Sequence, residues 1–145
     1  MEIDLQPIGF VRNSITEPHK QDWQSVVSEI VVNQNFREAL SGIDEFSHII
    51  VIWWMHRITP SERSIMKVHP RKDRNLPLTG VFATRSPARP NPIGIATVKL
   101  LERRDNILKV SGLDAVDGTP VLDIKPHIPG SDSPAGAKVP DWLNK

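Results

Sequence analysis

Two arginines stand close together in a proline-rich segment, "TRSPARPNPIG", that runs from Thr84 to Gly94. Each residue that precedes a proline there is pushed out of the α region toward extended backbone torsions. Such a segment is stiff before anything binds to it, and stiffness lowers the entropic cost of recognition. Guanidinium groups donate paired hydrogen bonds to carboxylates and phosphates. The segment is therefore either a preorganised anion-recognition loop that uses Arg85 and Arg89, or a structural turn with solvated arginines.

A second segment with polar chemistry is "DAVDGTPVLDIKP", from Asp114 to Pro126. It combines two carboxylates, Asp114 and Asp117, with a tight turn and a proline at the start of an apolar run. The carboxylates can bind ribose hydroxyls or an ammonium group. The pattern does not match an EF-hand loop, and turn capping at Asp117-Gly118 is the competing interpretation.

Basic side chains gather between Met55 and Asn75. Six basic residues against Glu62 and Asp73 give this segment a net charge of +4, in a chain whose total is +1. The basic residues are Arg57, Arg63, Lys67, Arg71, Lys72 and Arg74. A basic surface on an otherwise slightly acidic body suits a phosphate-bearing partner such as RNA. The alternative is a solvated loop.

Several common chemistries are excluded by the residues themselves. Ser86 is followed by a proline and lies outside any Gly-x-Ser-x-Gly elbow, so it is not expected to be a hydrolase nucleophile. Without a P-loop or a Gly-x-Gly-x-x-Gly turn, a nucleotide-like cofactor is not bound in the Rossmann manner. His48 and His56 would lie about 26 Å apart on one strand at about 3.3 Å per residue, too far to share a metal. No metal is therefore expected.

The chain of 145 residues has the size of one domain with its own hydrophobic core. We expect this domain over residues 1–130, with an irregular tail of the same domain over residues 131–145. The absence of cysteine excludes disulfides and thiolate metal sites and fits a reducing cytoplasm. Neither a signal-peptide pattern nor an apolar run of the ~20 residues that span a bilayer is present. The expectation is a soluble, unprocessed cytoplasmic protein without a membrane partner.

Strand patterns outnumber helix patterns and recur at short intervals. Seven short segments are rich in β-branched and aromatic residues and are separated by turn formers. These segments are residues 8–14, 26–32, 48–54, 80–84, 95–101, 107–111 and 121–124. The pattern predicts an all-β protein, either a barrel or a sandwich. We favour a single small barrel with short connecting helices, because closure removes exposed sheet edges.

Two segments carry further local signals. Residues 33–44 predict a short connecting helix that is capped by Asn35 and closed by Gly42 in the left-handed conformation. The apolar run at residues 48–55 lacks alternation, which predicts a strand covered on both faces. Such a strand is either central in the sheet or part of a subunit interface.

Three segments together resemble a known family. "GIDEFSHIIVIWWMH", "GVFATRSPARPNPIG" and "VSGLDAVDGTPVLDIKPHIP" are similar to motifs of the TrmO/TsaA-like family, also called YaeB-like or VirR-like. Its members are S-adenosyl-L-methionine-dependent tRNA methyltransferases that methylate N6 of threonylcarbamoyladenosine at tRNA position 37. The resemblance extends from about Ile8 to Pro129. It implies a small β-barrel that works as a homodimer on tRNA, with the cofactor bound near the subunit interface.

The resemblance also implies roles for individual residues. The positions that match the family's cofactor contacts are Lys20, Gln21, His56, Arg57, Arg85, Ile95, Asp114, Ala115, Val116 and Asp117. We expect Arg85 to bind a carboxylate of cofactor or substrate, and Asp114 and Asp117 to lie near cofactor hydroxyl or amino groups. The candidate tRNA contacts are Arg89, Asn91, Lys67, Arg71, Lys72 and Arg74. No general base is assigned; His56 and an aspartate are candidates.

Two other functions stay open at this point. One is a non-catalytic RNA-binding barrel whose arginines contact phosphate, which predicts steeply salt-dependent RNA binding that S-adenosyl-L-methionine does not affect. The other is a methyltransferase that acts on a small molecule or a protein, which predicts good cofactor binding with weak tRNA affinity.

Overall fold

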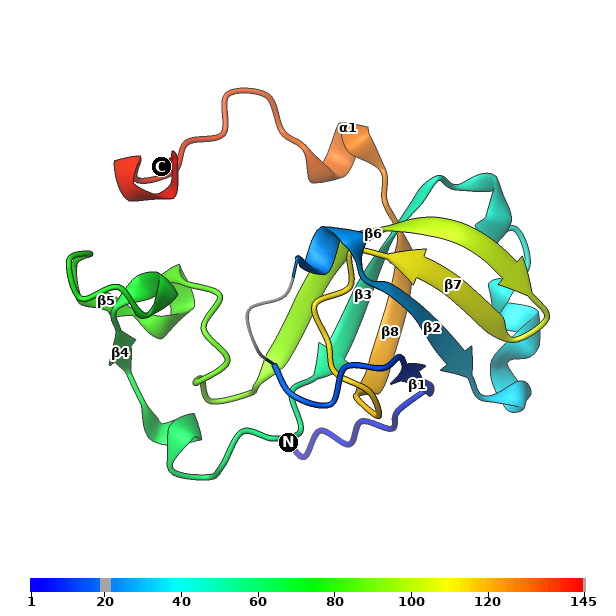
Figure 1. Ribbon diagram of the computed structural model, residues 1–145, viewed down its shortest axis with the longest axis horizontal. Coiled ribbons are helices and arrows are strands. Elements are labelled where there is room, and N and C mark those ends of the chain that lie inside the picture. Colours follow the sequence, from blue (N-terminus) through cyan, green and yellow to red (C-terminus); the bar gives the residue numbers. More distant parts are fainter. Residues whose placement is uncertain (19–21, 145) are drawn as a thin grey trace. The chain divides into compact units, whose positions relative to one another are not determined.

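The computed structural model describes residues 1–18 and 22–144. The chain divides into two compact units, shown as one ribbon in Figure 1. The first unit comprises Met1–Arg57 and Ile93–His127, and the second comprises Ile58–Pro92 and Ile128–Lys145. Most of the second unit is thus inserted, along the chain, between two parts of the first. The predicted domain boundary at residue 130 stays a prediction.

The first unit is a closed antiparallel barrel, as the sequence predicted. Its strands, within the described residues, are β1 (Gly9–Arg12), β2 (Val27–Val32), β3 (His48–Trp54), β6 (Ile93–Arg104), β7 (Ile107–Ser111) and β8 (Pro120–Pro126). They follow one another around the barrel in the order β1-β2-β7-β6-β3-β8. The last neighbours, β8 and β1, close the ring through the pairs Gly9↔Val121 and Phe10↔Pro120. The expected strands at residues 8–14, 26–32, 95–101, 107–111 and 121–124 are therefore confirmed.

Strand β3 supplies the centre of the barrel core. Ile49, Val51 and Trp53 are buried, while the residues between them are half-buried and His48 is exposed. The strand expected at residues 48–54 is confirmed. The prediction that both of its faces are covered holds for the inward face, whereas the other face is only half-buried. β3 pairs with β6 on one side and β8 on the other, as each strand of a closed barrel has two neighbours.

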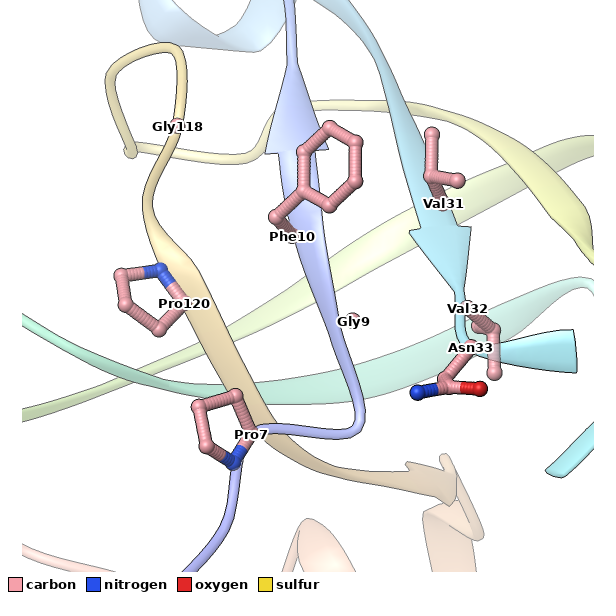
Figure 2. Close-up of a pocket in the computed structure, with 8 residues that line it drawn as sticks. All are labelled: Pro7, Gly9, Phe10, Val31, Val32, Asn33, Gly118 and Pro120. Carbon is pink, nitrogen blue, oxygen red and sulfur yellow. The ribbon is translucent and has the colours of Figure 1, made fainter. Parts of the chain in front are cut away.

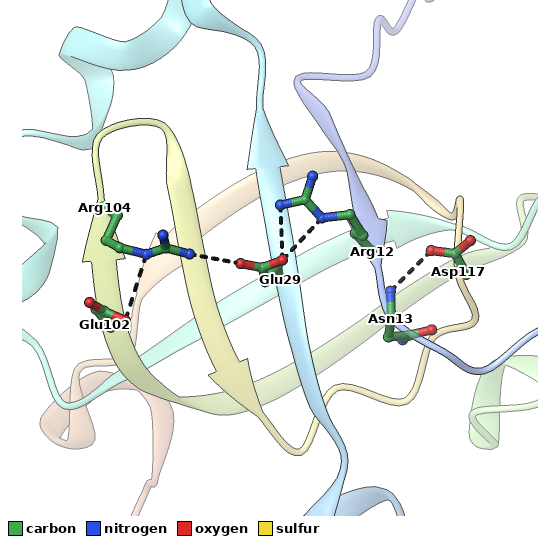
Figure 3. Close-up of polar contacts among 6 residues, drawn as sticks. All are labelled: Arg12, Asn13, Glu29, Glu102, Arg104 and Asp117. Atoms are coloured by element: carbon green, nitrogen blue, oxygen red, sulfur yellow. Dashed lines mark hydrogen bonds and ion pairs between the residues drawn. The ribbon is translucent and has the colours of Figure 1, made fainter.

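A cross-strand ion network lies on the polar outer face of the barrel (Figure 3). The Glu29 carboxylate of β2 accepts from Arg12 of β1 at 2.9 Å and from Arg104 of β6 at 3.1 Å. Arg104 also lies 3.7 Å from the Glu102 carboxylate. Surface pairs of this kind each contribute little to stability, although a bridging carboxylate couples three strands. This face therefore serves mainly to keep the sheet solvated on its outer side.

The connection between β2 and β3 differs in detail from the sequence prediction. It forms two 3₁₀ turns, η2 (Gln34–Leu40) and η3 (Ile43–Glu45). The predicted cap at Asn35 was wrong: Asn33 is the cap, and its side-chain oxygen accepts from the backbone N–H of Asn35 at 3.0 Å. Gly42 is left-handed as predicted, with φ of 89°. Another 3₁₀ turn, η1 (Trp23–Ser25), precedes β2.

The second unit has little regular structure. Its elements are η4 (Glu62–Ser64), β4 (Lys67–Val68), η5 (Pro70–Lys72), β5 (Thr79–Gly80), η6 (Val81–Ala83), α1 (Pro129–Asp132) and η7 (Asp141–Asn144). The strand predicted at residues 80–84 was wrong beyond Gly80. The chain turns there because the backbone N–H and the hydroxyl of Thr84 both donate to Val81 O, at 3.1 and 2.9 Å. None of the helices in the described part of the chain is long and apolar enough to cross a membrane.

Candidate functional site

The loop from Asp114 to Asp117 is fixed to the segment that follows β1. The Asn13 side chain donates to Ser28 Oγ and to Ala115 O, both at 2.9 Å, and its oxygen accepts from the Ile15 N–H at 2.9 Å. Asp117 Oδ1 in turn accepts from the backbone N–H of Asn13 at 3.0 Å, as Figure 3 shows. Asn13 therefore connects β2, the end of β1 and this loop, and it holds the loop in one conformation.

The four residues of this loop have different surroundings. Ala115 and Val116 are buried and attach the loop to the barrel, whereas Asp114 and Asp117 are exposed. Partial burial of its carboxyl raises the pKa of Asp114, because the charged form loses part of its hydration. Asp117 fixes the turn with its carboxylate, and Gly118 follows it with a φ of 83°. The loop thus presents one partly desolvated carboxyl group, that of Asp114, on a rigid backbone.

The predicted residues on β3 and β6 lie at or near the paired ends of these strands. His56 and Arg57 follow β3, are both exposed, and Arg57 makes an ion pair with Glu17 at 3.5 Å. Ile95 is 47% exposed and therefore lies on the outer face of β6, opposite Ile52 of β3. The predicted contacts Lys20 and Gln21 lie outside the described residues.

Gly94, the last residue of the "TRSPARPNPIG" segment, has a packing role within the barrel. Gly94 is paired with Trp53 across β3 and β6. A Cβ atom at Gly94 would lie 2.3 Å from Trp53 Cε2, so only glycine lets the indole lie against the backbone. The motif is therefore constrained at this end by core packing.

The two arginines of the "TRSPARPNPIG" segment, in the second unit, behave differently. Arg89 is half-buried, and its Nη1 donates to both Thr84 O and Ser86 O at 3.1 Å. Arg85 is exposed and, within the described residues, its side chain makes no hydrogen bond or ion pair. One guanidinium is thus used to shape the loop, and the other has its donors available.

The far end of the same loop is held by an arginine from η4. Arg63 Nε donates to Pro90 O at 2.6 Å, and Arg63 Nη2 donates to Asn91 Oδ1 at 3.3 Å. Thr59 and Glu62 form a capping box before it, in which Glu62 Oε1 accepts from the Thr59 N–H at 3.1 Å. Those hydrogen bonds from Thr59 hold the pKa of Glu62 below its usual range. The capping box therefore orients the short turn from which Arg63 reaches the loop.

The predicted phosphate contacts in the basic segment are not equivalent. Lys67, Lys72 and Arg74 are exposed. Arg71 instead donates to Trp142 O and Leu143 O, both at 3.4 Å, and its guanidinium carbon lies 5.9 Å from the centre of the Trp142 ring. Arg71 and Lys72 both have a φ of 56°, which is unusual for residues other than glycine. The end of the tail is thus held through contacts of Trp142 and Leu143 with Arg71.

A shallow apolar hollow of about 390 Å³ lies on the barrel surface (Figure 2). The residues that line it are Pro7, Gly9, Phe10, Val31, Val32, Asn33, Gly118 and Pro120. None of these is a predicted cofactor contact, and the lining offers few polar groups. The hollow is therefore not the candidate site. Across the described ranges, no three His, Cys, Asp or Glu side chains are arranged to hold a metal ion.

Comparison with known proteins gives the family. Residues 12–133 match the family of the tRNA-methyltransferase O N-terminal domain. The chain belongs to the TrmO family. The match includes both the arginine loop and the Asp114–Asp117 loop, and it supports the resemblance that the motifs suggested.

Relatives of this TrmO-family chain are similar over most of its length. The protein named "Probable S-adenosyl-L-methionine-binding protein" from Methanothermobacter thermautotrophicus is 44% identical over 137 residues, which cover 92% of this chain and 96% of that protein. The mouse protein named "tRNA (adenine(37)-N6)-methyltransferase" is 42% identical over 105 residues, 72% of this chain and 24% of that protein. A crystal structure of TrmO superimposes with a TM-score of 0.77 and 34% identity, over 96% of this chain and 64% of that chain. The chain thus spans less than two thirds of that TrmO structure.

Two residues that matter for the TrmO-family loops were missed from the sequence. Asn13 was given no role beyond its place in the segment 8–14, and Arg63 none beyond the basic segment. Asparagine directly after a strand is a signal for side-chain bonding to neighbouring backbone, but it does not identify the partner loop. For Arg63, the Thr-x-x-Glu pattern at Thr59–Glu62 was available as a sign of a helical start.

Proposed function

We propose that this chain is an S-adenosyl-L-methionine-dependent methyltransferase that methylates N6 of threonylcarbamoyladenosine at position 37 of tRNA. The observation that carries the proposal is the family match over residues 12–133, which contains both candidate loops. The names of the Methanothermobacter and mouse relatives support, respectively, the cofactor and the tRNA adenine. The non-catalytic RNA-binding barrel is disfavoured by the same match.

The side chains present suit the chemical groups of the cofactor. S-adenosyl-L-methionine carries a carboxylate, an ammonium, ribose hydroxyls and an adenine ring. Arg85, with its donors available, suits the carboxylate. Asp114, on a loop fixed by Asn13, suits a hydroxyl or the ammonium, and the exposed Ile95 offers an apolar surface for a ring.

Positioning is the main contribution that these residues can make to the reaction. When bound, S-adenosyl-L-methionine supplies an electrophilic methyl group on a sulfonium. Rigid loops such as Asp114–Asp117 hold reacting groups at attack distance, a source of up to roughly 7–11 kcal/mol of barrier reduction in favourable cases. Methylation of N6 also releases a proton, which an exposed acceptor such as His56 or Asp114 can take before passing it to water.

Further parts of the proposal concern assembly and location. We propose a cytoplasmic homodimer. The apolar side chains Met66 and Phe82 are 70% and 80% exposed, which supports a subunit interface that covers them. Lys67, Lys72 and Arg74 are proposed to contact tRNA phosphates. Sedimentation analysis of the wild type and of Phe82→Ser tests the dimer; a wild-type monomer at all concentrations would exclude it.

Calorimetric titration with S-adenosyl-L-methionine tests the cofactor. We expect saturable binding by the wild type and a roughly 10–100-fold larger dissociation constant for Arg85→Ala, because hydrogen bonds to charged groups contribute ~1.5–3 kcal/mol. Arg37→Ala is the matched control, since Arg37 is also exposed and, among the described residues, pairs with Asp105 at 3.5 Å. Absence of saturable wild-type binding at millimolar cofactor would remove the main support for an enzyme.

Transfer of labelled methyl groups tests the substrate. We expect labelling of tRNA that carries threonylcarbamoyladenosine and none of tRNA that lacks the modification. Equal labelling of both tRNAs would contradict the proposed N6 specificity. Good cofactor binding without labelling of either tRNA would favour a small-molecule or protein substrate.

A further inference from the structure

We propose that Arg89 is a positioning residue for Arg85 and does not itself contact tRNA. The inference rests on the proposed function, because it assumes that Arg85 binds the carboxylate of S-adenosyl-L-methionine. It assigns to Arg89 a role different from the substrate contact expected from the sequence.

The hydrogen bonds of Arg89 enclose Arg85 on both sides along the chain. The two acceptors, Thr84 O and Ser86 O, belong to the residues immediately before and after Arg85, and both bonds are 3.1 Å long. Because a single nitrogen, Nη1, joins the carbonyl of the peptide before Arg85 to the carbonyl of the peptide after Ser86, it restrains the backbone torsions of Arg85 and Ser86 together. The direction in which the Arg85 side chain leaves the backbone therefore depends on Arg89.

Hydroxyl groups add to the same restraint. The backbone N–H of Ser86 donates to Thr84 Oγ1 at 3.1 Å, and that of Ala88 donates to Ser86 Oγ at 3.2 Å. These short-range bonds form two successive turns, and Pro87 and Pro90 fix further torsions around them. The Arg89 side chain adds its bonds to Thr84 O and Ser86 O, which belong to the same two turns.

The state of the two guanidinium groups separates their roles. Arg89 is half-buried, and its Nη1 is bonded to two carbonyls of its own loop, so the loop fixes the position of its guanidinium group. Arg85 is exposed and keeps its donors for a ligand. A second arginine, Arg63, holds Pro90 O and Asn91 Oδ1 and so restrains the other end of the loop.

Binding of S-adenosyl-L-methionine without tRNA is the measurement that tests this role. Arg89→Met keeps the length of the half-buried stem but removes the donors, and we expect roughly tenfold weaker cofactor binding. Arg89→Lys keeps a charged donor that ends one bond short of Nη1, so we expect its cofactor binding to lie between that of the wild type and that of Arg89→Met. Arg85→Lys is expected to lose more, since a paired contact with a carboxylate needs the guanidinium fork.

A double-mutant cycle distinguishes positioning from an independent contact. In the Arg85→Ala background, measured by equilibrium dialysis with labelled cofactor, Arg89→Met should weaken binding by no more than about twofold. Circular dichroism and thermal midpoints establish that each variant is folded; if Arg89→Met does not fold, Arg89→Lys remains the deciding variant. An equal loss of cofactor binding from a folded Arg89→Lys in the wild-type and Arg85→Ala backgrounds would then overturn the proposal.

Three results would each overturn the positioning role while leaving the proposed function intact. The first is an unchanged dissociation constant for Arg89→Met in a protein whose binding Arg85→Ala weakens. The second is an equal loss from Arg89→Met in both backgrounds, which indicates a direct contact. The third is unchanged cofactor binding combined with weaker tRNA binding, which returns Arg89 to the RNA surface. The proposed function fails separately, if the wild type neither binds the cofactor nor transfers methyl groups.

Discussion

The barrel and the second unit are stabilised by different interactions. In the barrel, inward-facing side chains such as Ile30, Ile49 and Leu108 are fully buried, so apolar burial dominates. In the described part of the second unit, only Pro70, Val81 and Pro92 are buried, and the chain is held by arginine side chains bonded to backbone carbonyls. Burial spreads its contribution over many contacts, whereas the second unit depends on a few directed donors. Substitutions in the barrel should therefore lower global stability, whereas substitutions in the second unit should mainly disturb local geometry.

The largest effect is expected from removing barrel core volume. Ile30→Ala should reduce the free energy of unfolding by about 2–5 kcal/mol, because Ile30 is fully buried and a cavity would remain. Ile65→Ala in the second unit is the matched control, and since Ile65 is 36% exposed its change should stay within about 0.5–1 kcal/mol. Urea unfolding measures both. Equal losses would contradict the contrast between the two regions.

Overpacking of the barrel should have the next largest effect. Gly94→Ala places a methyl group 2.3 Å from Trp53 Cε2 and should cost about 1–3 kcal/mol of unfolding free energy. Gly80→Ala in the second unit is the control, because nothing lies within 4 Å of a Cβ there. Thermal unfolding and near-UV circular dichroism detect the difference. A Gly94→Ala protein as stable as the control would mean that Trp53 can move at little cost.

The Asp114–Asp117 loop sharpens the comparison, because it belongs to the barrel unit but is fixed by polar bonds. Asn13→Ala removes three hydrogen bonds of 2.9 Å and leaves the buried Ser28 hydroxyl without that donor. The expected loss is about 1–3 kcal/mol, with faster hydrogen exchange in residues 114–117. Asn35→Ala serves as the exposed control. Unchanged exchange in the loop would show that Asn13 does not hold it.

A smaller effect is expected at Asp114 as the pH changes. Its pKa is raised by partial burial in the folded protein, so the folded state holds the proton to higher pH than the unfolded state. Stability should therefore fall as the pH rises from the usual carboxyl pKa through the raised one. Asp114→Asn removes this fall and should be slightly more stable than the wild type at neutral pH. Urea midpoints between pH 3 and 7 test this, and a wild type that gains stability relative to the variant over that range would contradict it.

The smallest effect, with the opposite sign, is expected at Glu62 in the second unit. Hydrogen bonds from Thr59 lower its pKa, so the stabilisation is present above the usual carboxyl pKa and is lost as the pH falls through the lowered one. Glu62→Gln keeps an acceptor for the capping box but has no charge to titrate. Hydrogen exchange in residues 59–64 should respond to acid in the wild type and not in the variant. An acid response of the same size in both would assign it to another group.

The barrel was largely predictable from the sequence because its determinants are local and repeated. Segments such as residues 107–111 have β-branched residues and adjacent turn formers, and this pattern marks a strand whatever its partner is. Residues 80–84 have a similar pattern but form a turn, because the Thr84 hydroxyl donates to Val81 O and the Val81 N–H donates to Met66 O, 15 residues away in the chain. Composition alone does not determine whether such a segment forms a strand or a turn.

The residue types of the candidate site were predicted from the sequence, but the contacts of each residue were not. The motif resemblance matched Arg85 to the cofactor, and Arg89 in the same stiff segment was expected to contact tRNA. The hydrogen bonds of the folded loop suggest another role for Arg89, because its guanidinium is bonded to two carbonyls of its own backbone. Arg71 is a similar case, since its partner Trp142 lies far along the chain. Roles that depend on such partners need the structure.

Closure of the barrel has a consequence for how the chain folds. The seam between β1 and β8 joins Gly9 to Val121 and Phe10 to Pro120, residues separated by most of the sequence. Contacts of such long range require the entropy of a large loop to be lost before they form, and they slow folding. During synthesis, β1 cannot pair with β8 until β8 has left the ribosome. The seam should form last, and a chaperone that shields the open edge of β1 would speed recovery of the native ring.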